Sequence, residues 1–593
     1  MWVGADGVAL RLMADGVDTL YSVPANGEFS FPATLVEGAS YVVAIASNPA
    51  RHTCAVASGA NGVVPGDRVT SIDIACSGAA VSITLSAPAP WVFDPTQDLQ
   101  QLLNASLVLQ DVTLTVSNSD GLVRSAQVAG VPVTLGLSSA PQALALGTNT
   151  IDVDLTAQGG LSKTYQIVID RGANIIGQSA YGKASNTAAM AYFGYSVAIS
   201  ADTMAVGAYG DANGSGAVYV FHRTGTAWTQ QAYLKASNAD ANDYFAASIA
   251  LADDTLVVGA IGERSNATGI DGNQLDNSTA SAGAVYVFQR IGTTWTQQSY
   301  IKSSQTTFGG GFGRAVALSQ DSLAVGASGE SVVYVFRRSG STWGPPTSIS
   351  VSRPATDVSS FGNAVSLSEN TLAVGDPYQD SSSYAGAVYV FQWNGTVWAQ
   401  QAYLKAAITG VDDYFGGAIA LSGDTLVVGA AGEDSSAIGI DGNQTDDRAD
   451  SAGAVYVFQR TGTAWAQQAY IKASNTGAKD GFGSSVAFAG DILAVGALGE
   501  GSSATGTGGD QASDSASYSG AVYVFRRSGP TWVQESYLKA SNTGQGDQLG
   551  GAMALSGDTL AVGAASEASS ADGIDGNQAD NGTGWAGAVY VFR

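Results

Sequence analysis

Short apolar runs separated by turn residues recur through the last two thirds of the chain. Within residues 193–238 the runs are SVAI, MAVGA, AVYVF and WTQQAYLK, and the segments between them contain Gly, Asn, Asp and Thr. Runs of this length with such boundaries predict short β-strands. The inner runs are apolar at successive positions, so we expect each sheet to be covered on both faces.

This four-strand unit is repeated seven times. Its copies open at an aromatic-glycine pair or the nearest equivalent, at Phe193, Phe245, Phe312, Phe361, Phe415, Phe482 and Leu549. The differences in repeat length come from one segment, which lies just before each GAVYVF-like run. A unit that cannot bury its own apolar faces must stack on its neighbours, so the repeat predicts one continuous array of sheets.

The ends of the array are complementary. The last copy stops at GAVYVFR and lacks the fourth run, whereas QSAYGKASN at 178–186 matches that run and precedes the first copy. An early strand that completes the last sheet would close a ring and leave no open edge. We therefore predict an all-β chain with a seven-bladed β-propeller of four-stranded blades over residues 173–593.

The repeated residues carry a family resemblance. Phe-Gly, Val-Gly-Ala and Gly-Ala-Val-Tyr-Val-Phe resemble the FG-GAP repeat of integrin α-subunit propellers and of many bacterial surface proteins. The resemblance implies an adhesive or partner-binding function, although propellers support many activities. Integrin-type blades hold Ca²⁺ in an Asp-x-Asp-x-Asp-Gly loop of the first hairpin. Here that turn reads Ser-Ala-Asp-Thr or Ser-Gly-Asp-Thr, so the integrin site cannot be transferred.

Two smaller β-sandwiches are predicted before the propeller, over 1–77 and 78–172. The first resembles a two-cysteine repeat domain of bacterial secreted proteins, and the second resembles a cadherin-like domain through its alternating strands around Gly159-Gly160. Cys54 and Cys76 are the only cysteines, which favours a disulfide and an oxidising compartment over two buried thiols. Such a bond would stabilise the domain by roughly 3 kcal/mol.

The charge of the chain limits its partners. There are 25 basic and 50 acidic residues, for a net charge of −25. Such a surface repels nucleic acid and anionic membranes and attracts cations, although solubility alone would also explain it. No apolar run approaches the ~20 residues of a membrane-spanning helix. MWVGADGVAL has no signal-peptide character, so we expect an export signal upstream of this sequence. We expect a monomer outside the cell or on its surface.

The chain contains few of the side chains that catalytic sites commonly use. Its two histidines, His52 and His222, belong to different predicted domains, so a Ser-His-Asp device or a multi-histidine zinc site is not expected. Nothing distinguishes one carboxylate pair among fifty acidic residues as a hydrolase site. We therefore predict a non-enzymatic protein.

Four blades, the second, fifth, sixth and seventh, carry an insert of 19 residues, at 264–282, 434–452, 501–519 and 568–586. Equal length in four copies indicates a defined conformation. Three inserts share Asp-Gly-Asn-Gln-x-Asp, and the sixth-blade copy is degraded. The shared oxygen-bearing residues are Asp271, Asn273 and Asp276; Asp441, Asn443 and Asp446; Asp575, Asn577 and Asp580; and Asp510 in the degraded copy. Ca²⁺ prefers oxygen ligands of this kind.

More carboxylates accompany the same four inserts. An acidic residue opens each insert (Glu263, Glu433, Glu500, Glu567), and an aspartate lies two residues before each aromatic-glycine position (Asp243, Asp413, Asp480, Asp547). We expect these residues to be neighbours on one face of the propeller. One hypothesis is a Ca²⁺ site in each of these blades. The alternative is that each aspartate caps its own loop by accepting backbone N–H groups.

The same face is where propellers usually bind ligands. Tyr518 and Trp585 lie near the ends of two inserts and are candidates for a ligand-contacting rim. The six tryptophans of the fourth strands are interpreted as blade packing. We predict a secreted or surface-displayed protein that binds an extracellular protein or glycan through this face. The alternative is a carbohydrate-binding or carbohydrate-active protein that uses the same face.

Overall fold

The structure is a computed structural model of the chain, which divides into two compact units, Met1–Ala173 and Asn174–Arg593. Each unit is described by itself. In the first unit the described residues are 8–14, 17–23, 40–47, 53–58, 61–63, 73–77, 81–85, 99–105, 111–118, 123–140, 142–143, 147–157 and 162–171. In the second unit they are 177–319, 321–352, 359–380 and 383–593.

The described part of the first unit is built of β-strands. They are β1 (Val8–Ala14), β2 (Val17–Val23), β3 (Ser40–Ser47), β4 (Thr53–Ser58), β5 (Asn61–Val63), β6 (Asp73–Ser77), β7 (Val81–Leu85), β8 (Leu99–Ala105), β9 (Asp111–Val112), β10 (Leu114–Asn118), β11 (Val123–Val128), β12 (Val131–Val133), β13 (Gln142–Ala143), β14 (Gly147–Ala157) and β15 (Ser162–Arg171). The largest sheet has the order β12-β11-β14-β15-β8, with β8 parallel to β15.

The predicted alternating strands form an antiparallel pair. Ile151 in β14 lies opposite Ile167 in β15, and Ile151, Val153 and Leu155 are buried while Asp152 is exposed. The predicted turn at Gly159-Gly160 lies outside the described residues. In the β4–β6 pair Cys54 lies directly opposite Cys76 along the backbone. Their side chains are outside the described part of the structure, so the disulfide stays a prediction.

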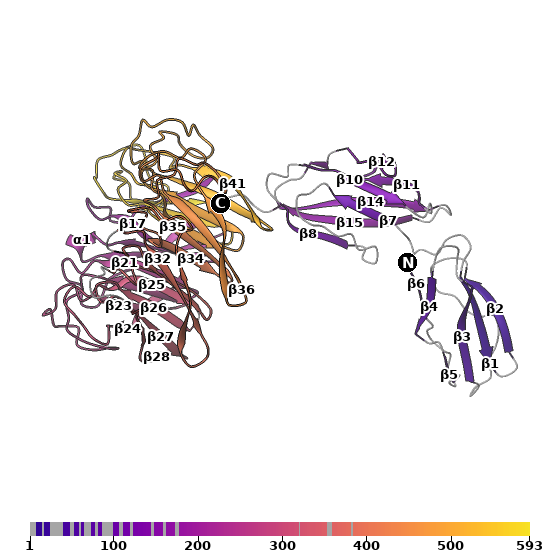
Figure 1. Cartoon of the computed structure of the whole chain (residues 1–593), viewed down its shortest axis with the longest axis horizontal. Helices are drawn as coiled ribbons and strands as arrows, with labels where there is room; N and C mark the ends of the chain where they lie inside the picture. The colour runs from indigo at the N-terminus through magenta and orange to yellow at the C-terminus, as the bar shows by residue number, and fades with distance from the viewer. Residues whose placement is uncertain are drawn as a thin grey trace. The chain divides into compact units, whose positions relative to one another are not determined.

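The second unit contains seven four-stranded antiparallel sheets arranged as blades (Figure 1). Blades 1 to 3 are β17 (Phe193–Ser200), β18 (Thr203–Ala208), β19 (Ala217–Thr224), β20 (Ala227–Leu234); β21 (Phe245–Ala252), β22 (Thr255–Ala260), β23 (Ala284–Ile291), β24 (Thr294–Ile301); and β25 (Phe312–Ser319), β26 (Ser322–Ala327), β27 (Val332–Ser339), with an outer strand in two pieces, β28 (Thr342–Trp343) and β29 (Thr347–Ile349).

Blades 4 to 6 are β30 (Ala364–Ser368), β31 (Thr371–Asp376), β32 (Ala387–Trp393), β33 (Trp398–Leu404); β34 (Ala418–Ser422), β35 (Thr425–Ala430), β36 (Ala454–Thr461), β37 (Ala464–Ile471); and β38 (Phe482–Ala489), β39 (Ile492–Ala497), β40 (Ala521–Ser528), β41 (Thr531–Leu538). Blade 7 is β42 (Ala552–Ser556), β43 (Thr559–Ala564), β44 (Ala588–Phe592) and β16 (Gln178–Gly182). One short helical turn, α1 (Asp211–Gly214), lies in blade 1.

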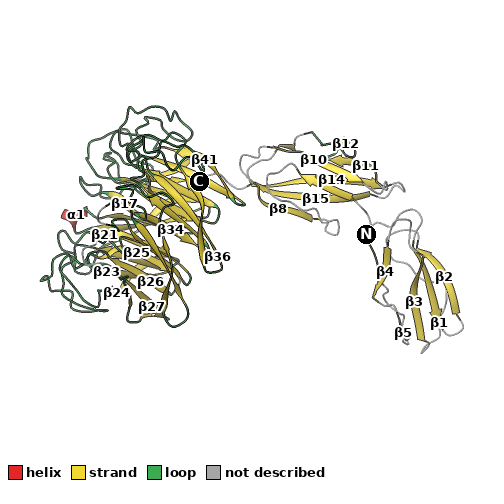
Figure 2. Cartoon of the chain, viewed as in Figure 1, coloured by secondary structure: helices red, strands yellow, loops and turns green. Residues whose placement is uncertain are grey.

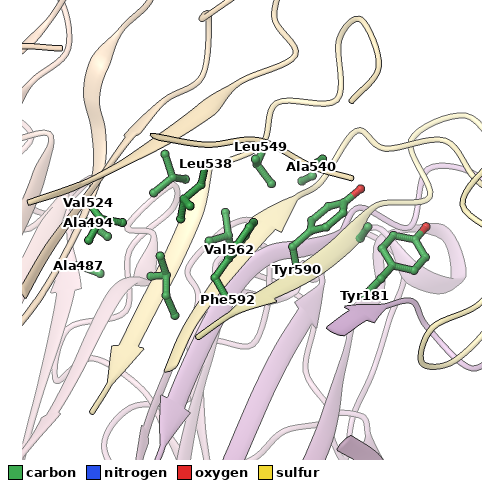
Figure 3. Packing of buried hydrophobic residues seen from close by; sticks show 14 of the residues in the cluster. Tyr181, Ala487, Ala494, Val524, Leu538, Ala540, Leu549, Val562, Tyr590 and Phe592 are labelled. Carbon is green, nitrogen blue, oxygen red and sulfur yellow. The ribbon is translucent and has the colours of Figure 1, made fainter. Parts of the chain in front are cut away.

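The ring closes as the sequence predicts. β16 pairs antiparallel with β44, so that Tyr181 lies opposite Tyr590, and the innermost strands β17 and β42 of the first and last blades are in contact. Figure 3 shows Tyr181 and Tyr590 in one buried cluster with side chains of blades 6 and 7, including Leu538 and Val562. The seven-bladed propeller with an early strand in its last blade is therefore confirmed.

The glycines of the repeat permit close contact between neighbouring blades. A Cβ on Gly259, in the second strand of blade 2, would lie 2.3 Å from the carbonyl oxygen of Gly313 in blade 3. Gly313 itself has φ +91°, a conformation that side chains disfavour. The Phe-Gly and Val-Gly-Ala motifs thus meet across each such blade junction, which is the physical reason that both contain glycine.

Aromatic and charged side chains pack at the two ends of each blade. Phe245 packs edge-on against Tyr286, with ring centroids 5.4 Å apart. At the other end of the same blade, Arg290 stacks over Trp295 at 5.4 Å and forms an ion pair with Asp254 at 2.6 Å. Among the six fourth-strand tryptophans Trp228, Trp295, Trp343 and Trp532 are buried, which fits blade packing. Asp254 occupies the short first turn, so this aspartate serves an ion pair.

The propeller has two distinct faces. The loops between second and third strands and the loops that enter each first strand emerge together at one end of the blades, which we call the loop face. Figure 2 shows loop segments gathered on the side where α1 lies. The tight hairpin turns emerge at the other end. Within the described residues, no helix combines the length and the apolar character needed to cross a membrane.

Candidate functional site

The four 19-residue inserts fold back onto the outer strand of their own blade. In blade 2 the N–H of Asp271 donates to the carbonyl oxygen of Tyr300, and the Tyr300 N–H donates to Asp271 Oδ1 at 2.9 Å. Asp441 and Asp575 form the same pair of bonds with Tyr470 and Tyr181. In the degraded copy Gly508 replaces this aspartate and keeps only the backbone bond, to Tyr537. The aspartate therefore links the insert to the outer strand of the sheet by hydrogen bonds.

The other shared residues of the insert stabilise turns. Asn273 Oδ1 accepts the N–H of Leu275 at 3.1 Å, and Asp276 accepts the N–H groups of Asn266 and Ser278. Backbone N–H donors lower the pKa of the Asp276 carboxyl, as donors to an anion should. The equivalent turn acceptors in the other three blades are Asn443, Asp446, Asn577, Asp580 and Asp510.

The glutamate that opens each insert lies in a buried ion pair. Glu263 Oε2 is 2.6 Å from Lys302 Nζ, and both side chains are 1% exposed. Its other oxygen accepts the hydroxyl of Tyr300 at 2.8 Å and an amide N–H of Asn238 at 3.1 Å. Burial lowers the pKa of Lys302, and the neighbouring carboxylate opposes that effect. The same lysine pair is formed by Glu433 with Lys472, Glu500 with Lys539, and Glu567 with Lys183.

The aspartate before each aromatic-glycine position caps its own loop. Asp243 is buried, and its Oδ2 accepts the N–H of Asp240 at 2.8 Å. Asp413, Asp480 and Asp547 accept the equivalent N–H groups of Gly410, Gly477 and Gly544. Burial raises the pKa of each of these four carboxyls to about 6, with a smaller contribution from the nearby glutamate. These backbone N–H contacts are the ones that the capping hypothesis describes.

The calcium site stays a prediction beside these contacts. Among the described residues, no group of three or more His, Cys, Asp or Glu side chains converges as metal ligands. The glutamates are neutralised by lysines, and one oxygen of each aspartate accepts a backbone N–H, while the other oxygen of Asp243 is buried with no hydrogen-bond partner. The expected neighbours do lie together on the loop face, but as parts of a hydrogen-bond network.

An exposed aromatic cluster on the loop face was not predicted. It consists of Trp585 from blade 7, Tyr192, Tyr195 and Tyr209 from blade 1, and Tyr244 from blade 2, and we call it the Tyr192 cluster. Tyr192 stacks on Tyr209 with centroids 5.0 Å apart and on Trp585 at 6.3 Å. Tyr209 also contacts Tyr195 at 4.4 Å and Tyr244 at 5.8 Å. Closure of the ring brings Trp585 beside Tyr192.

A second, smaller cluster lies at the junction of blades 4 and 5. The ring of Tyr378 is 5.8 Å from Tyr384 and 5.7 Å from Tyr414. Tyr414 also donates its hydroxyl to exposed Asp412 at 3.3 Å. We call this group the Tyr378 cluster. One signal in the sequence could have indicated both clusters, because tyrosine directly precedes Phe193, Phe245 and Phe415.

The two predicted rim residues differ in their surroundings. Trp585 and Tyr518 are each 50% exposed, as a ligand-contacting residue requires. Trp585 belongs to the Tyr192 cluster, whereas Tyr518, at the junction of blades 6 and 7, has no ring contact with the described residues. Its carbonyl oxygen accepts the N–H of Gln548 at 3.0 Å.

Comparison with known proteins identifies the repeated unit. A family model described as FG-GAP repeat matches residues 180–221, 228–288, 295–341, 355–391, 398–458, 465–525 and 532–592. These seven segments agree with the seven blades. The predicted resemblances of the first unit to a two-cysteine repeat domain and a cadherin-like domain gain no support, because every matched segment lies within the propeller. No curated protein matches the chain.

Several solved structures have a distant likeness in fold. They include a putative 6-phosphogluconolactonase from Bacteroides uniformis (10% identity, TM-score 0.38, covering 66% of this chain and 92% of that one), a protein from Lactobacillus plantarum (14%, 0.38, 61% and 88%), and Sqt1 from Chaetomium thermophilum (15%, 0.37, 70% and 90%). At these TM-scores none of the three indicates what this chain binds or catalyses.

Proposed function

Because the chain belongs to the FG-GAP repeat family, we propose that it is a non-enzymatic binding protein, located outside the cell or on its surface, that holds its ligand on the loop face of the propeller. The ligand is an extracellular protein or glycan. Members of this family are often extracellular, which supports the location. We propose that the chain acts as a monomer.

The observation that carries this proposal is the exposed aromatic surface of the loop face. Trp585, Tyr195 and Tyr378 are 50%, 42% and 44% exposed. Aromatic side chains are enriched in binding surfaces because they supply a large apolar area while their polar atoms stay hydrogen-bonded or wet. These residues belong to two aromatic clusters on the same face, which favours a binding role for that face.

The acidic residues support binding over catalysis. A hydrolytic pair of carboxylates needs one group free to attack or to transfer a proton. The buried glutamates of the long inserts are instead held by lysine ammonium groups, as Glu263 is by Lys302. Aspartates such as Asp276 accept several N–H groups of their own turns.

The proposal is tested by measuring binding of the labelled full chain to an array of extracellular matrix proteins and glycans. The loop-face variant combines Tyr518→Arg with Trp585→Arg. The matched control is Thr293→Arg, an exposed position in the hairpin turn between β23 and β24 on the opposite face. We expect the loop-face variant to lose at least tenfold in affinity and the control to bind like the wild type.

Two outcomes would contradict the proposal. One is loss of binding in Thr293→Arg while the loop-face variant binds normally. The other is cleavage of a bound polysaccharide, measured as new reducing ends, that disappears when a single carboxylate is changed. That second result would establish the alternative, a carbohydrate-active enzyme.

A further inference from the structure

The Tyr192 cluster is centred on blade 1, which lacks the long insert. In blade 1 the loop between β18 and β19 is short, and it contains only α1 and its flanking residues. The neighbouring blades 7 and 2 both carry 19-residue inserts, at 568–586 and 264–282. Blade 1 contacts both neighbours through its innermost strand. The cluster is therefore flanked on two sides by long, polar loops.

The rings of the cluster form one connected surface. From Trp585 the contacts run to Tyr192 at 6.3 Å, on to Tyr209 at 5.0 Å, and then to Tyr244 at 5.8 Å. Trp585 and Tyr195 are the most exposed members, and Tyr209 is half-buried between the others. Exposed aromatic faces and edges of this kind can pack against the C–H groups of a ligand.

The polar atoms of the cluster are uncharged. Burial and the hydroxyls of Tyr192, Tyr195 and Tyr244 raise the pKa of Tyr209 to about 12, and no carboxylate contributes to this shift. Four phenol groups therefore lie close together. The hydroxyls of Tyr192, Tyr195 and Tyr209 make no hydrogen bond with other described residues. They are available as donors and acceptors for a ligand.

The backbone of the cluster has positive φ, as the equivalent positions of other blade junctions do, for example Tyr518 and Gln548 at 57° and 60°. Tyr192 and Trp585 have φ values of 54° and 56°, and the Tyr192 N–H donates to the Trp585 carbonyl oxygen. At the junction of blades 2 and 3 the equivalent pair is Ser281 and Gly311. A bulky residue is disfavoured in this region of φ, whereas glycine is not. The fold alone does not require aromatic residues here.

We propose that the Tyr192 cluster binds an uncharged glycan chain. Aromatic rings pack against the C–H faces of sugars, and the convergent phenol groups exchange hydrogen bonds with sugar hydroxyls. An anionic ligand finds no cationic partner in the cluster, and the net charge of −25 repels it. This inference rests on the proposed function and names the ligand class of the same face.

The Tyr378 cluster favours a glycan polymer over a single protein epitope. It is a second group of tyrosines, in blades 4 and 5 of the same face, and its members Tyr384 and Tyr414 also have positive φ, at 47° and 55°. A polysaccharide presents the same sugar unit many times. Two similar sites can therefore bind one chain together and gain affinity from their linkage.

The experiment uses the full chain and isothermal titration calorimetry with uncharged oligosaccharides (β-glucan, mannan and xylan hexaoses), and heparin as the anionic probe. The variants are Tyr192→Gly and Trp585→Gly, because glycine accepts the positive φ and removes the ring without strain. Tyr192→Phe, Tyr195→Phe and Tyr209→Phe combined keep the rings and remove three hydroxyls. The control is Asp253→Gly, an exposed position with φ 50° in the hairpin turn between β21 and β22, on the face opposite the loop face.

We expect at least one uncharged hexaose to bind, with a tenfold or greater loss in Tyr192→Gly and in Trp585→Gly. The triple phenylalanine variant should show a smaller loss, and Asp253→Gly no change. Preferential binding of heparin, or affinity unchanged in Tyr192→Gly and Trp585→Gly, would overturn the inference. If the loop face binds only a protein on the array, the inference fails and the proposed function stands. If the array shows no loop-face ligand of either kind, both fail.

Discussion

The buried lysine-glutamate pair of the closing blade allows a quantitative test of how the ring is held together. Lys183 follows β16, and its ammonium group lies 2.7 Å from Glu567 Oε2, with both side chains 1% exposed. The two residues come from opposite ends of the propeller sequence. Lys302 and Glu263 form the same pair within blade 2, whose strands are consecutive. Lys183→Met and Lys302→Met are therefore matched perturbations.

Removing the lysine leaves a carboxylate buried without its cation. Breaking a buried ion pair in this way costs about 3–5 kcal/mol, most of which is the penalty for the remaining charge. Two donors stay on Glu567, the Tyr181 hydroxyl at 3.1 Å and an Asn542 amide N–H at 2.9 Å. We therefore expect a loss in the free energy of unfolding near the lower limit, about 3 kcal/mol. The double change Lys183→Met with Glu567→Gln removes the charge and should recover at least half of that loss.

Urea denaturation followed by tryptophan fluorescence measures these changes. Of the ten tryptophans only Trp2 and Trp91 precede the propeller, so the signal reports mainly on the blades. If Lys183→Met stays within about 1 kcal/mol of the wild type, or if the double variant is no more stable than the single one, the buried pair does not hold the ring as argued. A much larger loss in Lys183→Met than in Lys302→Met would mean that the closing strand detaches as a unit.

Three further predictions concern stability. Asp243, Asp413, Asp480 and Asp547 have pKa values raised to about 6 against an ordinary 3.8. Their contribution is fully present below pH 3.8 and is lost as pH rises through 6. Changing all four to Asn should therefore flatten the pH dependence of Tm between about pH 4 and 6.5, and an unchanged slope would contradict this. Gly259→Ala should cost at least about 2 kcal/mol in urea denaturation, because its Cβ would lie 2.3 Å from a backbone oxygen. Gly584→Ala, with open space around its Cβ, is the control and should stay within about 0.5 kcal/mol. Under the capping hypothesis, dialysis against EDTA should leave Tm unchanged within about 1 °C by differential scanning fluorimetry, whereas a drop that CaCl₂ reverses would support the calcium hypothesis.

The fold could be predicted because it depends on information that each repeat contains. Seven copies of four apolar runs, with the orphan run at 178–186, specify the number of blades and the strand that closes the ring. The shared inserts were also recognisable as defined loops. The aspartates could be placed near them, since both kinds of loop emerge at one end of an antiparallel blade.

The hydrogen-bond and ion-pair partners of the acidic residues could be identified only from the tertiary structure. The sequence contains Glu263 and Lys302 but does not show that the two side chains meet in a buried pair. The two hypotheses for the aspartates, cation ligand or loop cap, use the same residues. They differ only in whether backbone N–H groups or other oxygens surround the carboxylate, and that arrangement is a property of the folded loop.

The local pattern of apolar, glycine and turn residues thus defines the strands, the blades and their closure, because each blade is built from contacts within one repeat and with the next. The Tyr192 cluster arises differently. Trp585 could be singled out from the sequence as a rim candidate, but it is separated from Tyr192 by nearly the whole propeller sequence. Only the closed ring brings them within 6.3 Å of each other, so the candidate binding surface exists in the tertiary structure alone.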